Sequence, residues 1–297
     1  MSCQDAYFTG WSQCKGLMEK MEGAVINEKG TSFTEATTAL LATWQANIAA
    51  ATEAGRVSNP FPIMSFENTT DDISIATTSL GKSYKDGNPI PKGVLYLDAS
   101  VCDYNTLHSL EGITFQMTPF FQGGTHWQTK KSDGTLEGFT VRLATKAGLP
   151  PEDKQQSYPV YLFFDNYSEF EKIVVVDPGF GFNEVYDLAP IGMTLSEVTA
   201  YTGGDVVVKV VTRCQGTPKT GLSADDFLVL DSNATPTVAI TNATDDGLGQ
   251  YTLTIKKDNA GTPANLAASD WVVLQAQEVG TTYVDYLSQD LKLNGGA

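Results

Sequence analysis

One stretch of the sequence, from Arg56 to Asp98, reads RVSNPFPIMSFENTTDDISIATTSLGKSYKDGNPIPKGVLYLD. It combines two prolines around Phe61, an acidic polar segment, a Gly-Asn-Pro turn and the strand-like residues VLYL near its end. Proline and glycine turns between β-branched and aromatic runs are typical of strands joined by loops. The stretch therefore predicts a long hairpin with an acidic loop that projects from a mainly β domain.

The segment before this hairpin predicts a helix. Ser32 and Glu35 have the spacing of a capping box, in which the serine caps a backbone N–H and the glutamate reaches back. Side chains at helical spacing then form one stripe, which consists of Phe33, Thr37, Leu40, Leu41, Trp44, Ile48 and Ala51. Gly55 is expected to end the helix, and a sheet or a partner is expected to cover Trp44.

Strand-like runs follow the hairpin and predict an antiparallel sheet or barrel packed on the helix. Rich in β-branched and aromatic residues, they are Ile113–Met117, Phe139–Leu143, Tyr158–Phe164 and Lys172–Val176. Phe139, Val141 and Leu143 alternate with polar residues, which indicates a sheet with one buried face and one solvent-exposed face. The nearly continuous apolar run Tyr158–Phe164 indicates a central strand, whereas residues 1–30 show no sustained period.

A segment with three glycines and two prolines, Asp177–Thr194, predicts a linker between two domains, residues 1–194 and residues 195–297. Short strands recur beyond it at intervals of about ten residues, which is typical of a small β-sandwich. They are Val206–Thr212, Phe227–Asp231, Thr237–Thr241, Tyr251–Ile255 and Trp271–Ala276.

Two runs of this C-terminal part, KTGLSADDFLVLDSN and DDGLGQYTLTI, resemble the Ig-like modules of bacterial surface proteins and phage virion proteins. Tyr251 follows Asp246 and Gly249, where such modules place the tyrosine of their corner turn, although the D-x-G-x-Y spacing is stretched. The resemblance covers about a third of the chain and implies an Ig-like β-sandwich.

The composition limits the classes of ligand that the chain is expected to bind. Its 35 acidic against 19 basic residues give a net charge of −16, which disfavours nucleic acid and anionic membranes as ligands. A run of 18 apolar residues is missing, as is a basic-then-apolar leader, so we expect no membrane span and a location in the cytoplasm of the cell that makes the protein. The scattered cysteines are expected to be four reduced thiols, at Cys3, Cys14, Cys102 and Cys214.

The sequence contains no H-E-x-x-H, G-x-S-x-G or P-loop motif, so it predicts no catalytic residue, cofactor or metal ligand. His126 is expected at a loop tip, and His108 in a short turn or helix. The adjacent carboxylates Asp71 and Asp72 are expected to be solvated. Calcium binding stays open for two further pairs, Asp225-Asp226 and Asp245-Asp246, although neither has an EF-hand loop. Several aromatic residues are expected in the core or at a subunit interface, namely Phe120, Phe121, Trp127, Phe163 and Phe164.

Taken together, the helix, the β-rich domain with its hairpin and the Ig-like module resemble the major tail-tube proteins of tailed bacteriophages. The run N-P-F-P-x-x-x-F-E-N-T-T-D-D, which leads into G-K-x-Y-K-D-G-N-P, is similar to virion structural proteins of phages of Bacteroidetes hosts. The resemblance implies stacked hexameric rings, in which an arm from about Met64 to Pro91 reaches the next ring. The inter-subunit residues so implied are Met64, Phe66, Glu67, Asp71, Asp72, Tyr84, Lys85 and Asp86.

The same resemblance implies a mainly β (α+β) structural protein of the virion tail, with a tail-tube-like barrel or sandwich followed by the Ig-like domain. Its partners would be its own copies and other tail or connector proteins, and DNA would pass through the tube without specific binding. Three alternatives remain, one of which is a glycan-degrading depolymerase, a class that would need repeats or a paired acid site. The N-terminal residues and the Trp44 helix also suit a head-tail connector or tail-terminator ring, and an Ig-like sandwich also suits an adhesin or carbohydrate-binding protein.

Overall fold

The computed structural model is mainly β, as the sequence predicts. It describes residues 20–50, 53–72, 75–77, 83–85, 87, 89–97, 101–146, 158–202, 204–230, 239–256, 271–280 and 284–294. The described residues form two compact units: one contains the chain up to Ile48 together with Val57–Asp187, and the other contains Ala49–Arg56 and the chain from Leu188 onward. None of the helices in these ranges has the length and apolar composition needed to span a bilayer.

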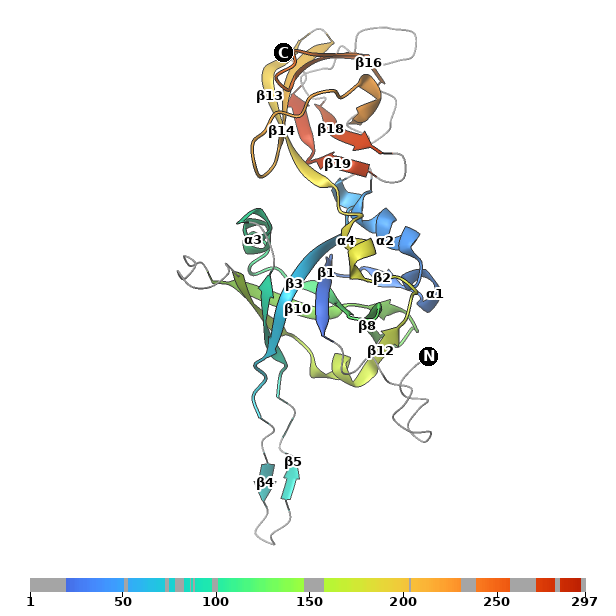
Figure 1. Cartoon of the computed structure of the whole chain (residues 1–297), viewed down its shortest axis with the longest axis vertical. Helices are drawn as coiled ribbons and strands as arrows, with labels where there is room; N and C mark the ends of the chain where they lie inside the picture. Colours follow the sequence, from blue (N-terminus) through green and yellow to red (C-terminus); the bar gives the residue numbers. More distant parts are fainter. Residues whose placement is uncertain are drawn as a thin grey trace. The chain divides into compact units, whose positions relative to one another are not determined.

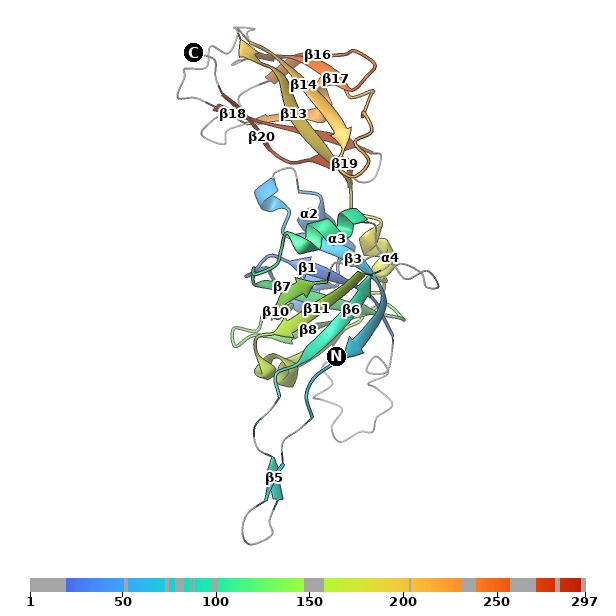
Figure 2. The same ribbon diagram turned by 90° about the vertical axis from the view of Figure 1, so that its left-hand side faces the viewer.

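The first unit is built on a closed barrel of six antiparallel strands (Figures 1 and 2). In order around the barrel, they are β1 (Met21–Asn27), β3 (Ser58–Asn68), β6 (Lys92–Leu97), β11 (Tyr158–Phe164), β10 (Phe139–Thr145) and β7 (Phe115–Phe121). The barrel closes because β1 pairs with β3 on one side and with β7 on the other. Closure leaves these six strands no free edge.

Shorter strands extend the sheet beyond β7. They are β8 (Thr125–Lys130), β9 (Leu136–Glu137), β2 (Ser32–Phe33) and β12 (Ile173–Val176). β8 pairs with β7, β9 and β12, and β9 pairs with β2. The turn between β9 and β10 needs Gly138, because a Cβ there would lie 2.9 Å from the backbone of Met117 on β7. The glycine thus lets β10 approach β7 closely.

The barrel interior is filled by side chains that the strand patterns predict. Phe139, Val141 and Leu143 of β10 are buried while Arg142 is exposed, which confirms the predicted alternation. β11 lies between β6 and β10, so the prediction of a central strand is also confirmed. β7 is buried at all of its positions, because it is covered on both faces.

The predicted continuous helix is wrong. Two short helices replace it, α1 (Glu35–Thr38) and α2 (Leu41–Ile48), and Leu40 between them is 55% exposed. Ser32 pairs with Glu137 in the sheet, so the N-cap is Thr34, whose hydroxyl accepts a hydrogen bond from the Thr37 N–H at 3.1 Å. Ala51 lies outside the described residues, and Gly55 closes the short 3-10 helix η4 (Glu53–Gly55).

Trp44 is fully buried, as the predicted apolar stripe requires. Its ring stacks on Phe33 at 4.9 Å and meets Phe120 of β7 edge-on at 5.4 Å. Its indole N–H donates to the carbonyl oxygen of Thr38 at 2.9 Å, at the end of α1. Trp44 therefore joins both short helices to the barrel wall.

The remaining helices of the first unit are α3 (Val101–His108), the 3-10 helix η5 (Tyr167–Lys172) and α4 (Phe182–Tyr186). α4 lies inside the predicted linker Asp177–Thr194, and Phe182 and Val185 are buried there. The Phe182 ring lies against Gly23 of β1, where a Cβ would be only 2.3 Å from the ring. The segment is thus packed in the first unit as far as Asp187, whereas from Leu188 onward it belongs to the second unit, in which β13 begins at Ile191.

The second unit contains one sheet system with its own core. Its strands are β13 (Ile191–Thr202), β14 (Asp205–Thr212), β15 (Phe227–Leu230), β16 (Ala239–Asp245), β17 (Gln250–Lys256), β18 (Trp271–Val279), β19 (Val284–Ser288) and β20 (Leu291–Asn294). Their order is β15-β18-β19-β13-β14-β17-β16, with β20 beside β18. β13 and β19 run parallel, and the other pairs are antiparallel.

Tyr251 of β17 is fully buried at the centre of this core. Its hydroxyl donates to the carbonyl oxygen of Lys219 at 2.8 Å and accepts from the N–H of Leu222 at 3.2 Å. Those backbone groups lie about thirty residues upstream, further than in the corner turn of Ig-like domains. The hydroxyl fixes the path of the segment that leads through the 3-10 helix η6 (Ala224–Asp226) into β15.

Cys214 of this unit is disulfide-bonded, so the prediction of four reduced thiols is wrong for this residue. The other cysteine side chains lie outside the described part of the chain. The second unit also holds Arg56, whose guanidinium donates to the carbonyl oxygens of Ala50 at 2.9 Å and Ser288 at 2.6 Å.

Candidate functional site

The predicted hairpin is present, and its base is the pair β3 and β6. Their register runs from Ile63 opposite Leu97 to Asn68 opposite Gly93, with one irregularity between Ile63 and Ser65. Gly93 makes room for the ring of Phe66, since a Cβ at Gly93 would lie 2.3 Å from it. This close approach lays the Phe66 ring across the end of the ladder.

Polar contacts extend the pairing past the last ladder residues. The Thr69 N–H donates to the Lys92 carbonyl oxygen at 3.1 Å, and the Lys92 N–H donates to the Thr70 hydroxyl at 3.0 Å. The Lys92 ammonium lies 2.9 Å from a carboxylate oxygen of Asp71. That ion pair is largely exposed, so it contributes little to stability.

Beyond this point the hairpin carries a second, separate ladder. β4 (Ile75–Thr77) and β5 (Ser83–Lys85) pair only with each other within the described residues. Figures 1 and 2 show this pair beyond the ends of β3 and β6. Ile75 is 67% exposed and Ile90, on the returning chain, is 55% exposed. We call residues 64–91 the hairpin arm.

The eight predicted inter-subunit residues all belong to the hairpin arm. Five are described with their side chains: Met64 is half-buried, and Phe66, Glu67, Asp71 and Asp72 are exposed. Tyr84 and Lys85 belong to β5, but their side chains lie outside the described part, as does the whole of Asp86. The structure thus brings the first residues together at the base of the arm and places β5 near its end.

Two of the three carboxylates of the arm base have partners of their own. Glu67 accepts a hydrogen bond from the Tyr96 hydroxyl at 3.2 Å. Partial burial, followed by this bond and the Glu67 charge, raises the pKa of Tyr96. Asp71 is held by Lys92, and Asp72 is exposed to solvent, as predicted for this pair.

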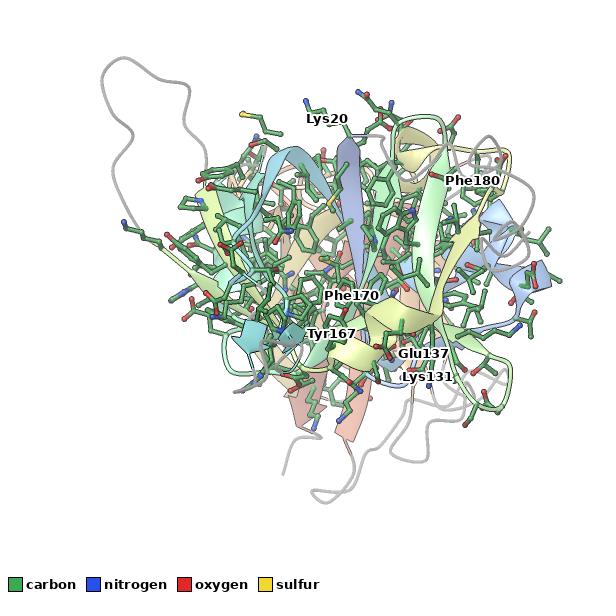
Figure 3. All side chains as sticks on the ribbon, turned by 90° about the horizontal axis from the view of Figure 1, so that it is seen from below. Lys20, Lys131, Glu137, Tyr167, Phe170 and Phe180 are labelled. Carbon is green, nitrogen blue, oxygen red and sulfur yellow. The ribbon has the colours of Figure 1, made fainter. Side chains whose placement is uncertain are left out.

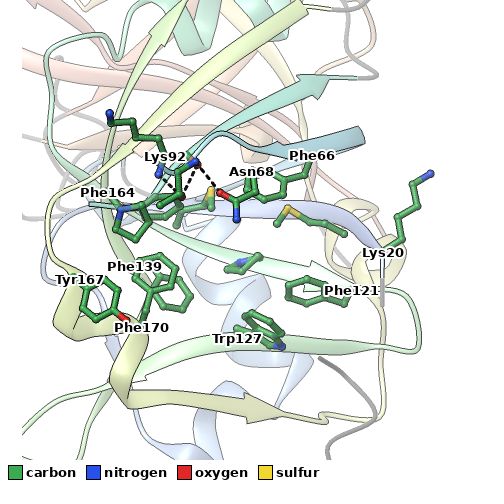
Figure 4. Close-up of a pocket in the computed structure, with 15 residues that line it drawn as sticks. Lys20, Phe66, Asn68, Lys92, Phe121, Trp127, Phe139, Phe164, Tyr167 and Phe170 are labelled. Atoms are coloured by element: carbon green, nitrogen blue, oxygen red, sulfur yellow. Dashed lines mark hydrogen bonds between the residues drawn. The ribbon is translucent and has the colours of Figure 1, made fainter. Parts of the chain in front are cut away.

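A cavity of about 540 Å³ lies inside the first unit where the arm meets the barrel (Figure 4). Its walls come from the arm base, the barrel strands and η5. The lining residues are Lys20, Met21, Phe66, Asn68, Thr70, Pro91, Lys92, Met117, Pro119, Phe121, Trp127, Phe139, Phe164, Tyr167 and Phe170. We call it the root cavity. Its volume is within the usual range for ligand pockets, about 300–1,000 Å³.

The root cavity is mainly aromatic because side chains of adjacent strands point inward at the same level. Phe170 of η5 stacks on Phe139 at 4.8 Å and meets Phe164 edge-on at 5.0 Å. Across the cavity, Phe121 and Trp127 pack at 4.5 Å. The sequence predicts several of these aromatics as core or interface residues, but nothing in it shows that they surround a cavity. That grouping depends on the order in which β11, β10, β7 and β8 pair.

The side of η5 away from the cavity carries an ion cluster (Figure 3). Lys131 lies 3.0 Å from Glu137 and 3.5 Å from the buried Glu169, which also accepts from the Thr140 N–H and hydroxyl. Burial lowers the pKa of Lys131, but the hydrogen bonds and charges of Glu137 and Glu169 outweigh it, so the pKa is raised overall. Glu169 therefore ties η5 to Thr140 of β10, and Lys131 links Glu169 to Glu137 of β9.

The prediction that His126 lies at a loop tip is wrong, because His126 is a fully buried residue of β8. Its Nε2 lies 3.0 Å from the hydroxyl of Thr38, and that hydroxyl donates to Gln128 Oε1 at 2.9 Å. Since the hydroxyl proton is used on Gln128, Nε2 must carry the proton that it donates to Thr38. Burial lowers the pKa of His126 to about 3. The imidazole is therefore neutral and structural.

In the other acidic pairs, Asp245, Asp246 and Asp226 stabilise turns. Asp245 accepts from the N–H groups of Gly221 and Gly247, and this bonding lowers its pKa. Asp246 accepts from the N–H groups of Leu248 and Gln250, and Asp226 accepts from the N–H and the hydroxyl of Ser223, the N-cap residue of η6. Within the described ranges, no three His, Cys, Asp or Glu side chains are close enough to hold a metal ion. His108, at the end of α3, contacts Thr145 and Glu111 and lies in a helix, as predicted.

A comparison with protein-family models and with curated proteins finds no match to the chain. Two neighbouring features of the first unit bear on function, the hairpin arm and the root cavity.

Proposed function

We propose that this chain is a structural subunit that assembles with its own copies into stacked rings, as in the tail tube of a bacteriophage. The single observation that carries the proposal is the hairpin arm. Its outer ladder, β4 and β5, is two strands wide, and in the described residues it packs on no other element. An isolated two-stranded ladder is marginally stable in water, and a third strand or an apolar cover is what stabilises one.

A neighbouring subunit supplies that cover in the proposed assembly. The exposed Ile75 and Ile90 would lie against the adjacent ring, and the arm backbone would pair with a strand edge there. The barrel itself has no free edge among its six strands, so it is a rigid support from which an arm can reach without exposing aggregation-prone strands.

The net charge of −16 is compatible with a conduit for DNA. Phosphates are repelled by an acidic wall, so DNA would pass through without binding. The second unit would be an Ig-like decoration on the outside of the tube. Its separate core around the buried Tyr251 supports this proposal, because it would allow the unit to fold independently of the barrel.

Negative-stain electron microscopy of the purified full chain tests the proposal, with mass photometry of the same sample. Rings or tubes of regular diameter are expected. A protein that stays monomeric at all concentrations would contradict assembly and would favour the adhesin or carbohydrate-binding alternative. Single closed rings that never stack would favour the connector or tail-terminator alternative.

A further inference from the structure

The root cavity lies directly beside the first described residues of the chain. Lys20 and Met21 line it, and the Lys20 carbonyl oxygen accepts a hydrogen bond from the Gln122 N–H at 2.9 Å. Met21 then pairs with Phe121, another lining residue, as β1 begins. The chain is therefore fixed at the edge of an apolar cavity at the point where the preceding residues join it.

Those preceding residues have the composition that the cavity would accept. Residues 7–18 read YFTGWSQCKGLM, which places Phe8, Trp11, Leu17 and Met18 within a short distance of Lys20 along the chain. An extended chain spans about 3.3 Å per residue, so the two residues from Met18 to Lys20 cover about 7 Å and the nine residues from Trp11 cover up to about 30 Å. Both positions can reach the cavity.

The cavity offers few polar groups to orient a small ligand, because three of its polar side chains are engaged at the arm base. Asn68 accepts from the Thr70 N–H at 3.0 Å, the Thr70 hydroxyl contacts the Lys92 backbone, and the Lys92 ammonium pairs with Asp71. The indole N–H of Trp127, which has no hydrogen-bond partner among the described residues, is buried and not open to a ligand. Small-molecule sites usually combine an apolar wall with a few polar groups aimed at the ligand. Apolar side chains of a tethered peptide need no such groups.

We propose that the root cavity is the docking site for the chain's own segment Tyr7–Met18, with Trp11 and Leu17 as the main inserted side chains. The attachment at Lys20 makes docking intramolecular, so it takes place at a high effective concentration and independently of protein concentration. The occupied cavity would include Phe66, Asn68 and Thr70 of the arm base, so the docked segment would also stiffen the point from which the arm leaves the barrel. This inference concerns the single chain and does not depend on ring assembly.

The test uses the full chain with a photo-crosslinking phenylalanine analogue in place of Trp11, irradiated at several protein concentrations and mapped by mass spectrometry. We expect cross-links to peptides that carry Met21, Met117 or Phe170, in the monomer band, with a yield independent of concentration. Phe66→Ala removes one cavity wall and should reduce this yield. Phe163→Ala is the matched control, since Phe163 is 40% exposed, Phe66 is 38% exposed, and only Phe66 lines the cavity.

Three outcomes would overturn the proposal. Cross-links found only in a band of twice the chain mass would assign the cavity to a second copy. Cross-links confined to other surfaces would leave the segment elsewhere. A small apolar molecule that co-purifies with the chain and is seen by native mass spectrometry would assign the cavity to a ligand. As a second readout, Trp11→Ser with Leu17→Ser should increase anilinonaphthalene sulfonate fluorescence, whereas Ser12→Ala with Gln13→Ser should not; no increase would also count against the proposal.

Discussion

Acid should destabilise the first unit through His126, and the effect can be isolated by one substitution. His126 is fully buried beside Phe120 and Trp44, and burial lowers its pKa to about 3. In the unfolded chain its pKa would be about 6.5. The folded state thus binds this proton less readily than the unfolded state, so the stability is complete above pH 6.5 and is lost as the pH falls toward 3.

The size of the effect follows from the two pKa values. Between pH 7 and pH 4.5, His126 alone should remove about 2.5 kcal/mol from the free energy of unfolding. Carboxylates with lowered pKa values act in the same direction, among them Glu111, Asp133 and Asp245, so the wild-type slope is not specific to His126. Their contribution cancels when a variant without the imidazole is compared with the wild type.

The assay is urea unfolding followed by circular dichroism at pH 7 and pH 4.5. His126→Gln keeps a side-chain N–H that can donate to Thr38 but cannot titrate, so its loss of stability in acid should be smaller than the wild-type loss by about 2.5 kcal/mol. His108→Gln is the control, because His108 is an exposed residue of the same unit. The two proteins are compared in the unfolding transition that the substitution shifts. If the wild type and His126→Gln lose the same free energy of unfolding between pH 7 and pH 4.5, burial of His126 is not a cause of the acid sensitivity.

Two further substitutions test the packing of each unit. Trp44→Ala should cost about 3–5 kcal/mol in the free energy of unfolding, because it removes a fully buried ring and leaves a cavity between the short helices and the barrel; a cost below about 1 kcal/mol in urea unfolding would place Trp44 outside the core. Tyr251→Phe should cost about 1–3 kcal/mol in the transition of the second unit, because the Leu222 N–H and the Lys219 carbonyl oxygen lose their partner; an unchanged midpoint would show that water replaces the hydroxyl.

Local sequence patterns predict the strands in which apolar and polar residues alternate, and the strands that are continuously apolar. Phe139–Leu143 and Tyr158–Phe164 belong to this class, and so does the hairpin, because its turn residues are explicit. The strand β1 escaped prediction because Gly23 breaks its pattern, and that glycine is required by the Phe182 ring, which comes from a distant segment. His126 was misplaced for the same reason, since the glycines before it suggest a loop while Thr38 and Trp44 bury it in a strand.

The predicted helix and the root cavity also depend on contacts between segments that are distant in the sequence. Ser32 and Glu35 have the right spacing for a cap, but pairing of Ser32 with Glu137 moves the cap to Thr34. The arm could be read from the sequence as a polar stretch between strands. The root cavity could not, because its aromatic walls come from β7, β8, β10, β11 and η5, and the order in which these strands pair is not visible in any local pattern.

Assembly through the hairpin arm is the central claim, and one comparison tests it most directly. The full chain and a variant in which residues 73–89 are replaced by a short Gly-Ser turn would be examined by electron microscopy at equal concentration. The replacement keeps Phe66, Asp71 and Lys92, so the arm base and the root cavity are retained. Gly-Ser replacement of the exposed β8–β9 turn at residues 132–134 is the matched control.

We expect stacked rings or tubes for the full chain and for the turn control. For the arm variant we expect unstacked rings with an unchanged unfolding midpoint. The arm variant keeps its fold because β4 and β5 contribute nothing to the barrel core among the described residues. Tubes that form equally well without residues 73–89 would contradict the claim.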